Sequence, residues 1–307
     1  MSSFCRRLIF FAVQNLVTRV LFNPSALFGW VETGGFVDPT LPNSFLLLVM
    51  RMGLGVPLIA VMLPPVYPNL WGDLRQLKQP THRRELWLAV VGGVLMFSYL
   101  GLLYVSVGLV ATGIALTLFF TFPVYTALLS WWWFGYRPSW PQWGIMAVIL
   151  IGSGLTIPTD HSSTLSWFGV GFGLLAAGVY AFYTVVAQKA FETLHPLPFT
   201  GISFATTLVM SAICLLIWRV DLQGLPWLGL WVGALLSAIA TAAGHLLNNL
   251  GIRLVGATAA AMVGAANPAL TAVLAWLGLQ EQLSWVQGLG VGLVTLSVAL
   301  LSLAKPS

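Results

Sequence analysis

Polar side chains stand inside long apolar segments of this sequence, at positions where they could bind a ligand. His245 and Asn249 are four residues apart, so on a helix they share one face. His245 could be a neutral hydrogen-bonding group between helices, which is its commoner role, or it could titrate in function. A single Thr or Tyr in such a segment more often joins two helices than binds a ligand. The candidate ligand-binding residues are Asn15, Arg19, Tyr99, Thr121, Tyr125, Tyr183, His245, Asn249, Asn267 and Thr271.

Two arginines also lie within the apolar segments. Arg51 is near enough to one end of its segment to snorkel to the interface or to pair with Glu32 or Asp38, so we expect a structural role for it. Arg19 lies deeper, about 16 Å from the start of its segment at a helical rise of about 1.5 Å per residue. An isolated charge at that depth usually serves a function. The alternative is that a kink at Pro24 shortens the helix and leaves Arg19 near water.

All the carboxylates fall in loops or at segment ends. They are Glu32, Asp38, Asp73, Glu85, Asp160, Glu192, Asp221 and Glu281. A proton-driven carrier usually holds a buried carboxylate that exchanges its proton for substrate. We therefore expect no carboxylate-based proton coupling, and His245 is the one titrating group expected inside a segment. An unpaired Arg19 would favour a ligand that brings a carboxylate or phosphate over a cation.

Several kinds of chemistry find no support in the residues. The sequence has no HExxH motif, no GxxxxGK[ST] phosphate loop and no nucleophile–base pair, so we expect no catalytic residues, no cofactor and no metal site. Cys5 and Cys214 lie far apart and indicate neither a disulfide framework nor a metal site. The net charge of +5 comes from basic residues scattered at segment ends, so we expect no nucleic-acid partner.

The composition shows what must position these residues. Of 307 residues, 58% are hydrophobic and 7% charged, whereas a soluble domain carries about 25% charged residues. A spanning helix needs about 20 apolar residues, and long continuous apolar runs favour helices over a barrel. We predict an all-α polytopic membrane protein in the lipid bilayer, with ten transmembrane helices at 8–30, 44–63, 86–107, 109–133, 140–158, 167–188, 199–218, 227–250, 254–279 and 283–303.

The chain is also internally duplicated. The segment 109–142 returns 145 positions later as 254–287 without a gap, with a proline, two tryptophans, a threonine and a glutamine in register. Pro123 and Pro268 fall near the middle of their spans, where proline removes the hydrogen bond to the carbonyl four residues earlier. They are either packing kinks or a pair of hinges that face a central cavity. The predicted halves, 1–158 and 159–307, hold five spans each.

The basic residues orient the chain. With the N-terminus in the cytoplasm, nearly all the basic loop residues fall on the cytoplasmic side, as the positive-inside rule requires. Because each half has an odd number of spans, the second half enters the membrane from the opposite side. The two five-helix repeats are therefore predicted to be inverted, as in many secondary transporters, with both termini in the cytoplasm.

With this organisation, the chain resembles the EamA-type transporters of the drug/metabolite transporter superfamily over nearly its whole length. Asn15 and Arg19 are similar to the asparagine and the basic residue of the family's first helix. Arg51 resembles the arginine of its second helix, and Pro123 and Pro268 resemble its repeated prolines.

A glutamate of the family's repeat is matched in one half only. Glu281 resembles this glutamate after the second-half proline helix and is expected to have a structural or topological role, whereas Tyr136 stands at the first-half position. The segment 23–40 is also longer than is usual in the family.

The resemblance implies a secondary transporter in the plasma (inner) membrane, an exporter or exchanger of a small organic solute that works by alternating access without an ATPase. It implies a core cavity lined by helices three, four, eight and nine with parts of one and six. An amino acid or another anionic or zwitterionic metabolite is the expected small-molecule solute. The alternatives are a lipid flippase, a channel-like facilitator and, with less support from the residues, an intramembrane enzyme; a homodimer is left open.

Overall fold

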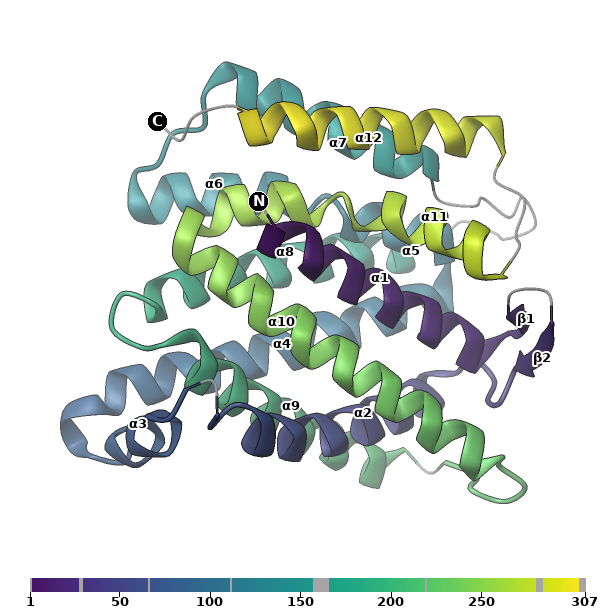
Figure 1. Cartoon of the computed structure of the whole chain (residues 1–307), viewed down its shortest axis with the longest axis horizontal. Coiled ribbons are helices and arrows are strands. Elements are labelled where there is room, and N and C mark those ends of the chain that lie inside the picture. The colour runs from purple at the N-terminus through teal and green to yellow at the C-terminus, as the bar shows by residue number, and fades with distance from the viewer. Residues whose placement is uncertain are drawn as a thin grey trace.

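The computed structural model describes residues 2–27, 30–65, 67–110, 112–156, 166–218, 220–279 and 284–303. Helices dominate it, and Figure 1 shows them packed beside one another with one small hairpin at the edge. The elements are α1 (Ser2–Phe22), β1 (Pro24–Leu27), β2 (Val31–Gly34), α2 (Leu41–Met62), α3 (Leu70–Gln76), η1 (Pro80–His82), α4 (Arg83–Leu109), α5 (Thr112–Phe119), α6 (Phe122–Phe134), α7 (Trp140–Thr156), α8 (Trp167–Ala190), α9 (Pro196–Ile217), α10 (Trp227–Gly264), α11 (Asn267–Leu279) and α12 (Trp285–Leu303).

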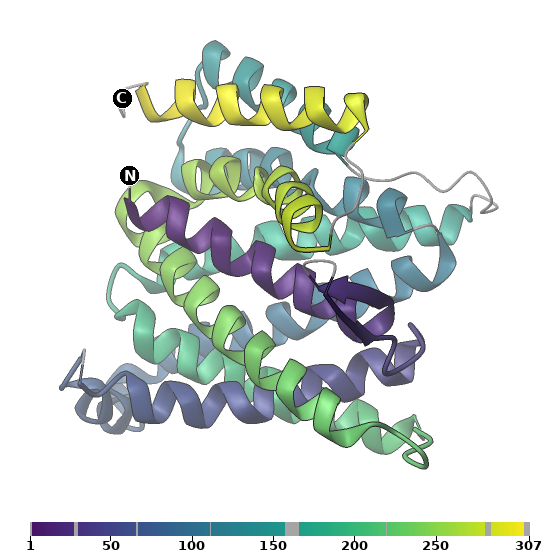
Figure 2. The ribbon, with the colours of Figure 1, turned by 45° about the vertical axis from the view of Figure 1, so that its right-hand side comes forward.

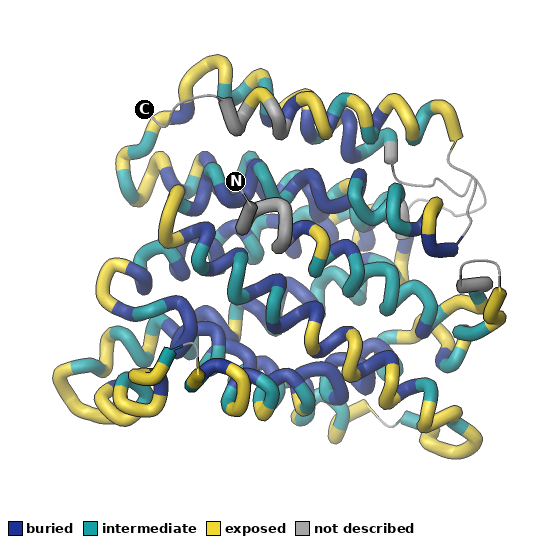
Figure 3. The backbone as a smooth tube through the Cα atoms, viewed as in Figure 1, coloured by how far each residue is buried: buried dark blue, intermediate teal, exposed yellow. Residues whose placement is uncertain are grey.

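The outer surface of the bundle is apolar. Six of the described helices are long and apolar enough to cross a membrane, and four shorter apolar helices lie among them. Trp132, Trp140 and Leu216 are each at least 80% exposed, and lipid would cover such side chains. Figure 3 shows the buried residues along the inner faces of the helices. The fold is that of a polytopic helical membrane protein, and the number of ten spans stays a prediction.

The first span is shorter than predicted. The expected helix 8–30 is wrong beyond residue 22, because Pro24 has no N–H with which to continue a helix. The chain instead forms the antiparallel hairpin β1–β2, so the fold is not purely α-helical. The Gly35 N–H donates to the Val20 carbonyl at 3.0 Å, which supplies a partner to the last turn of α1.

The two halves of the chain pack through equivalent pairs of helices. α4 of the first half lies along α8 of the second, and α10 of the second lies along α1 of the first. The contact between α6 and α8 corresponds to the contact between α11 and α1. The contact between α4 and α9 corresponds to the contact between α10 and α2. Exchanging each helix for its predicted counterpart in the other half leaves this pattern unchanged. α1 runs alongside α10 in Figures 1 and 2, and α7 lies beside α12 at one edge.

The ends of the bundle differ in what they carry. α1 begins and α12 ends at the same end, which is also where α3 lies (Figures 1 and 2). The hairpin β1–β2 lies at the opposite end. Loops far apart in sequence therefore meet at two well-separated faces.

Close helix contacts rest on small residues and hydroxyl groups. On α9, the Ser203 hydroxyl donates to the Ala89 carbonyl of α4 at 3.1 Å, and the Thr207 hydroxyl shares its proton between the Gly93 carbonyl of α4 at 3.1 Å and the Ser203 carbonyl of its own helix at 2.8 Å. A side chain at Gly93 would collide with the backbone of Ser203. In lipid no hydrophobic effect draws helices together, so such close contacts and interhelical hydrogen bonds hold α4 against α9.

The duplicated prolines mark helix breaks rather than kinks. α5 ends at residue 119 and α6 begins at 122, while α10 ends at 264 and α11 begins at 267, so both breaks keep the offset of 145 residues. Pro123 and Pro268 are each the second residue of the new helix, where a missing N–H costs little. Gly256 adds a further break inside α10, with a left-handed φ of 82°.

We predict that Pro123→Ala joins α5 to α6 and that Pro268→Ala joins α10 to α11. The new N–H can donate to the carbonyl four residues earlier, and a hydrogen bond worth about 0.5–1.5 kcal/mol slows amide exchange by about two- to tenfold. Hydrogen–deuterium exchange of the peptides around residues 119–124 and 264–269 measures this. Pro57→Ala, inside the unbroken α2, is the matched control and should leave both peptides unchanged. Wild-type exchange in both variants would mean that tertiary packing sets the breaks.

Candidate functional site

A buried hydrogen-bonded group joins α8, α9 and α10. The Tyr183 hydroxyl of α8 donates to Asn249 Oδ1 at 3.2 Å, and Asn249 Nδ2 donates to the Thr200 hydroxyl of α9 at 2.8 Å. His245, one turn before Asn249, meets the Tyr183 ring edge-on with centroids 6.4 Å apart. His245 and Asn249 thus lie on one face of α10 against Tyr183, and Thr200 joins them although it was not among the predicted residues.

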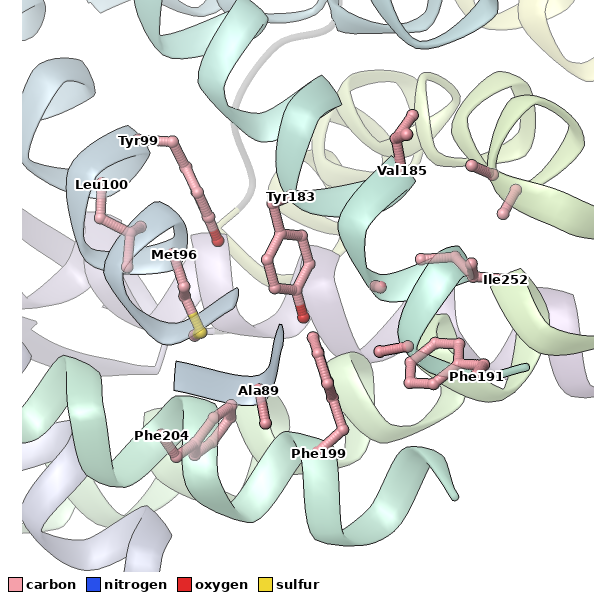
Figure 4. Close-up of a cluster of buried hydrophobic side chains, with 14 of the residues drawn as sticks. Ala89, Met96, Tyr99, Leu100, Tyr183, Val185, Phe191, Phe199, Phe204 and Ile252 are labelled. Atoms are coloured by element: carbon pink, nitrogen blue, oxygen red, sulfur yellow. The ribbon is translucent and has the colours of Figure 1, made fainter. Parts of the chain in front are cut away.

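Aromatic rings fill the space beside this group. The Tyr99 ring of α4 lies 4.9 Å from that of Tyr180, centroid to centroid, and it stacks on Phe119 at 5.9 Å. Figure 4 shows Tyr99 and Tyr183 pointing into the same interior region from α4 and α8. Tyr125 is partly buried against this core. Two predicted residues, Tyr99 and Tyr183, thus meet in an aromatic core that packs the helices together.

The other predicted residues are spread more widely. Asn15 Nδ2 of α1 donates to the Thr271 hydroxyl of α11 at 3.2 Å, so this predicted pair does come together. Asn267, the first residue of α11, is 9% exposed, and its Oδ1 has no partner among the described atoms. Thr121 instead donates to the Leu118 carbonyl at 2.6 Å, within the break between α5 and α6.

One face of α10 carries a polar stripe. Ser237, Thr241, His245 and Asn249 follow one another at intervals of four residues, and each is at most 4% exposed. Thr241 Oγ1 and His245 Nδ1 have no hydrogen-bond partner among the described atoms. Buried polar atoms without partners are costly, so this stripe is suited to water or to a polar ligand.

Arg51 lies at the Ser237 end of this stripe. The whole residue is only 6% exposed, and its guanidinium donates through Nη2 to the Tyr104 hydroxyl at 3.2 Å, while Nε has no partner among the described atoms. The expected snorkelling and the expected pair with Glu32 or Asp38 are both wrong, because α2 begins ten residues before Arg51, about 15 Å along the helix, and turns the side chain inward.

The small space around this guanidinium is the Arg51 cavity, which is lined by Thr18, Leu21, Phe22, Ser44, Leu47, Arg51, Tyr104, Ala234 and Ser237. It leaves about 10 Å³ for the centre of a water-sized sphere, which is room for about one water molecule. Side chains therefore nearly fill the cavity.

Two further predicted positions need correction or lie outside the described residues. Arg19 stands in the last turn of α1 rather than deep within a span, as the alternative reading of Pro24 expected. It is partly buried and already interacts with another residue, so it is not an unpaired charge. Glu281 lies outside the described residues.

A larger opening lies at the end of the bundle that carries α3, between the segment from Tyr67 to Glu85 and the turn after α8. This α3 cleft has a volume of about 260 Å³ and is lined by charged and aromatic residues that include Asp73, His195 and Arg253. The Tyr67 and His195 rings stack with centroids 4.2 Å apart. No pattern in the sequence indicated these residues as a site, because they come from α3, the N-terminus of α9 and α10, which are far apart in the chain.

The electrostatics of the α3 cleft are set by short polar contacts. Tyr67 donates its hydroxyl proton to Asp73 Oδ2 at 2.7 Å, and this hydrogen bond raises the pKa of Tyr67. Burial lowers the pKa of His195, and Arg253 lowers it further. His195 Nδ1 accepts the Leu197 N–H at 3.3 Å and so caps α9. No group of three or more His, Cys, Asp or Glu within the described parts of the chain could hold a metal ion.

The profile of the EamA-like transporter family matches this chain twice, at residues 36–157 and 167–303. The uncharacterized transporter sll1319 of Synechocystis sp. is 50% identical over 301 residues, which cover 97% of this chain and 92% of that protein. The uncharacterized transporter YwfM of Bacillus subtilis is 27% identical over 188 residues, or 59% of this chain and 61% of YwfM.

The fold also resembles a solved one. A protein of known crystal structure superposes with a TM-score of 0.72 over 98% of this chain and 95% of its own, at 14% sequence identity. At this low identity the match shows a shared fold only. The relatives point to a transporter rather than an enzyme. From two matches that together cover most of its length, the chain belongs to the EamA-like transporter family of the drug/metabolite transporter superfamily, and it is an integral membrane transporter.

Proposed function

We propose that this chain is a secondary transporter that exports or exchanges a small organic solute, an amino acid or another anionic or zwitterionic metabolite, by alternating access. The two halves, 1–158 and 159–307, act as inverted repeats that rock against each other. The protein works in the plasma (inner) membrane with both termini in the cytoplasm, as a monomer or a homodimer. This orientation fits α1 beginning and α12 ending at one end of the bundle.

The observation that carries the proposal is the exchangeable pattern of helix contacts. α4 on α8 and α10 on α1 use the same pairs of repeat positions, as do α4 on α9 and α10 on α2. Two inverted repeats that pack in this way can adopt two conformations, because each half can take the arrangement that the other now has. In one conformation a central site opens to the cytoplasm, and in the other it opens to the outside.

The openings support a cytoplasm-facing conformation. The α3 cleft of about 260 Å³ lies at the end where α1 begins, whereas the Arg51 cavity near the hairpin end leaves only about 10 Å³. Movement between the two conformations needs points that can bend. The breaks before Pro123 and Pro268 are the proposed hinges, one in each half at the same register.

The charges favour facilitated transport. Every described carboxylate lies in a loop, a turn, the hairpin, α3 or the first turn of α4. No described carboxylate therefore sits where it could carry a proton across the membrane. Transport then follows the solute gradient or exchanges one solute for another.

A liposome experiment tests the proposed function. Purified protein should give saturable flux of amino acids or organic acids, and solute on the far side should accelerate it, because alternating access returns a loaded site faster than an empty one. An imposed pH gradient should not drive accumulation. Flux without saturation or acceleration would indicate a channel, scrambling of fluorescent lipids without solute flux would indicate a flippase, and uphill accumulation driven by pH would contradict facilitated transport.

The α3 cleft adds a dependence on pH. His195 has a lowered pKa in the folded protein, relative to about 6.5 for an unfolded histidine. Its contribution to stability is therefore complete above about pH 6.5 and is lost as the pH falls below that value, because the unfolded chain then binds the proton more readily. Protonation also removes the Nδ1 lone pair that accepts the Leu197 N–H.

We predict that the thermal unfolding temperature of the purified protein falls between about pH 7.5 and pH 5.5, and that His195→Asn makes this fall shallower. Asparagine can still cap α9 but does not titrate. Differential scanning fluorimetry across this range measures the slope. Equal slopes in both proteins would show that His195 does not carry the effect.

A further inference from the structure

We infer that Arg51 binds the carboxylate of the transported solute, and that this solute carries a hydrogen-bond donor next to the carboxylate, as an α-amino or α-hydroxy acid does. The inference rests on the proposed transport function and assigns its solute site to the Arg51 cavity. It moves the anion-binding role from Arg19 to an arginine whose sequence position indicated only a structural role.

Arg51 carries a positive charge inside a span. A guanidinium stays protonated in proteins, and an arginine that is 6% exposed within a membrane span needs a partner of opposite charge. Neither the His82–Glu85 nor the Lys189–Glu192 ion pair includes Arg51. Its Tyr104 partner is a neutral hydroxyl, and its Nε has no partner among the described atoms. A solute carboxylate can accept from Nε and a terminal nitrogen together, in the bidentate geometry that guanidinium prefers.

Two hydroxyl groups that line the Arg51 cavity direct their protons away from it. The Thr18 hydroxyl donates to the Gln14 carbonyl of its own helix at 2.9 Å, and the Ser44 hydroxyl donates to the Thr40 carbonyl at 2.9 Å. A hydroxyl that donates within its own helix offers only oxygen lone pairs to the cavity. The cavity therefore presents a cation for a carboxylate and two acceptors for an N–H or O–H beside it.

Equivalent positions in the two halves have different hydrogen-bond partners. The duplication places Tyr104 at the register position of Asn249, 145 residues later. Asn249 bonds both Tyr183 and Thr200, so its network is complete within the chain. Tyr104 bonds an arginine that still lacks a partner for one donor. The second-half position thus serves packing, whereas the first-half position is left for a ligand.

The polar stripe of α10 leads inward from the Arg51 cavity. Ser237 lines the Arg51 cavity and begins the polar stripe that continues through Thr241 and His245. Thr241 Oγ1 and His245 Nδ1 are buried and without partners among the described atoms. A polar solute leaving Arg51 would find hydrogen-bonding groups along α10, whereas a purely structural arginine would not require them. The present 10 Å³ is too small for a solute, so the site is occupied only after the outer side opens.

Binding to the purified full-length protein tests the inference separately from transport. The probes are L-amino acids, their carboxamides, which lack the carboxylate, and their desamino acids, which lack the donor. We expect thermal stabilisation in the order amino acid, desamino acid, carboxamide. Arg51→Gln should weaken amino-acid binding by about 10- to 100-fold, the range for hydrogen bonds to a charged group, and should abolish the preference over the carboxamide. Tyr104→Phe should weaken it less, and Arg75→Gln, an exposed arginine on α3, is the matched control.

The outcomes separate the site from the function. Arg51→Gln that elutes as folded protein and keeps the carboxylate preference would overturn the inference, as would a wild-type protein that binds carboxamides as well as amino acids. If Arg51→Gln does not fold, Arg51→Lys and Tyr104→Phe decide, and wild-type affinity in both would overturn it. Carboxylate binding without accelerated exchange in liposomes would contradict the proposed transport and leave the site intact.

Discussion

Lipid supplies no hydrogen-bond partners, and this constraint governs the whole structure. Every polar group inside a span must find its partner within the chain or in something that the protein carries. Most do so: the Ser203 and Thr207 hydroxyls of α9 bond carbonyls of α4, and Asn249 is bonded on both sides. Some described polar atoms do not: Ser130, Thr258 and Asn267 are scattered, whereas Arg51, Thr241 and His245 follow one another along α2 and α10. Their position connects the energetics of folding with the proposed path of the solute.

The same constraint would allow the helices to rearrange without unfolding, as the proposed alternating access requires. Close contacts in lipid depend on small residues and local hydroxyl bonds rather than on a hydrophobic core. Equivalent pairs of helices make these contacts in the two halves, and breaks precede Pro123 and Pro268 at the same register. A structure built from two equivalent sets of interfaces can exchange one arrangement for the other at modest cost, which is what alternating access requires.

Much of this architecture could be predicted from the sequence, because its signals are strong and local. Long apolar runs predict the helices, and the duplicated proline predicts paired interruptions. The hairpin after α1 was missed because its pairing depends on left-handed backbone at Gly34 and Gly35, which hydrophobic periodicity does not reveal. The prediction of the partners of Arg51 was wrong for another reason. The position of a residue along a helix gives its depth in the membrane, but the direction of its side chain depends on packing against α4. The α3 cleft joins loops from both halves, and no local pattern predicts such a meeting.

Alternating access makes one demand that can be measured without knowing the solute. In a Cys5→Ser, Cys214→Ser background, Gln76→Cys and Thr193→Cys place two thiols on opposite sides of the α3 cleft, and a bifunctional maleimide can hold that cleft closed. Ser237→Cys then reports whether the Arg51 cavity opens to an impermeant thiol reagent added from outside. The account predicts that cross-linking raises the rate of Ser237→Cys modification by about tenfold or more, since closing one side shifts the population toward the other. An unchanged rate after complete cross-linking, with the single Gln76→Cys protein as control, would contradict it.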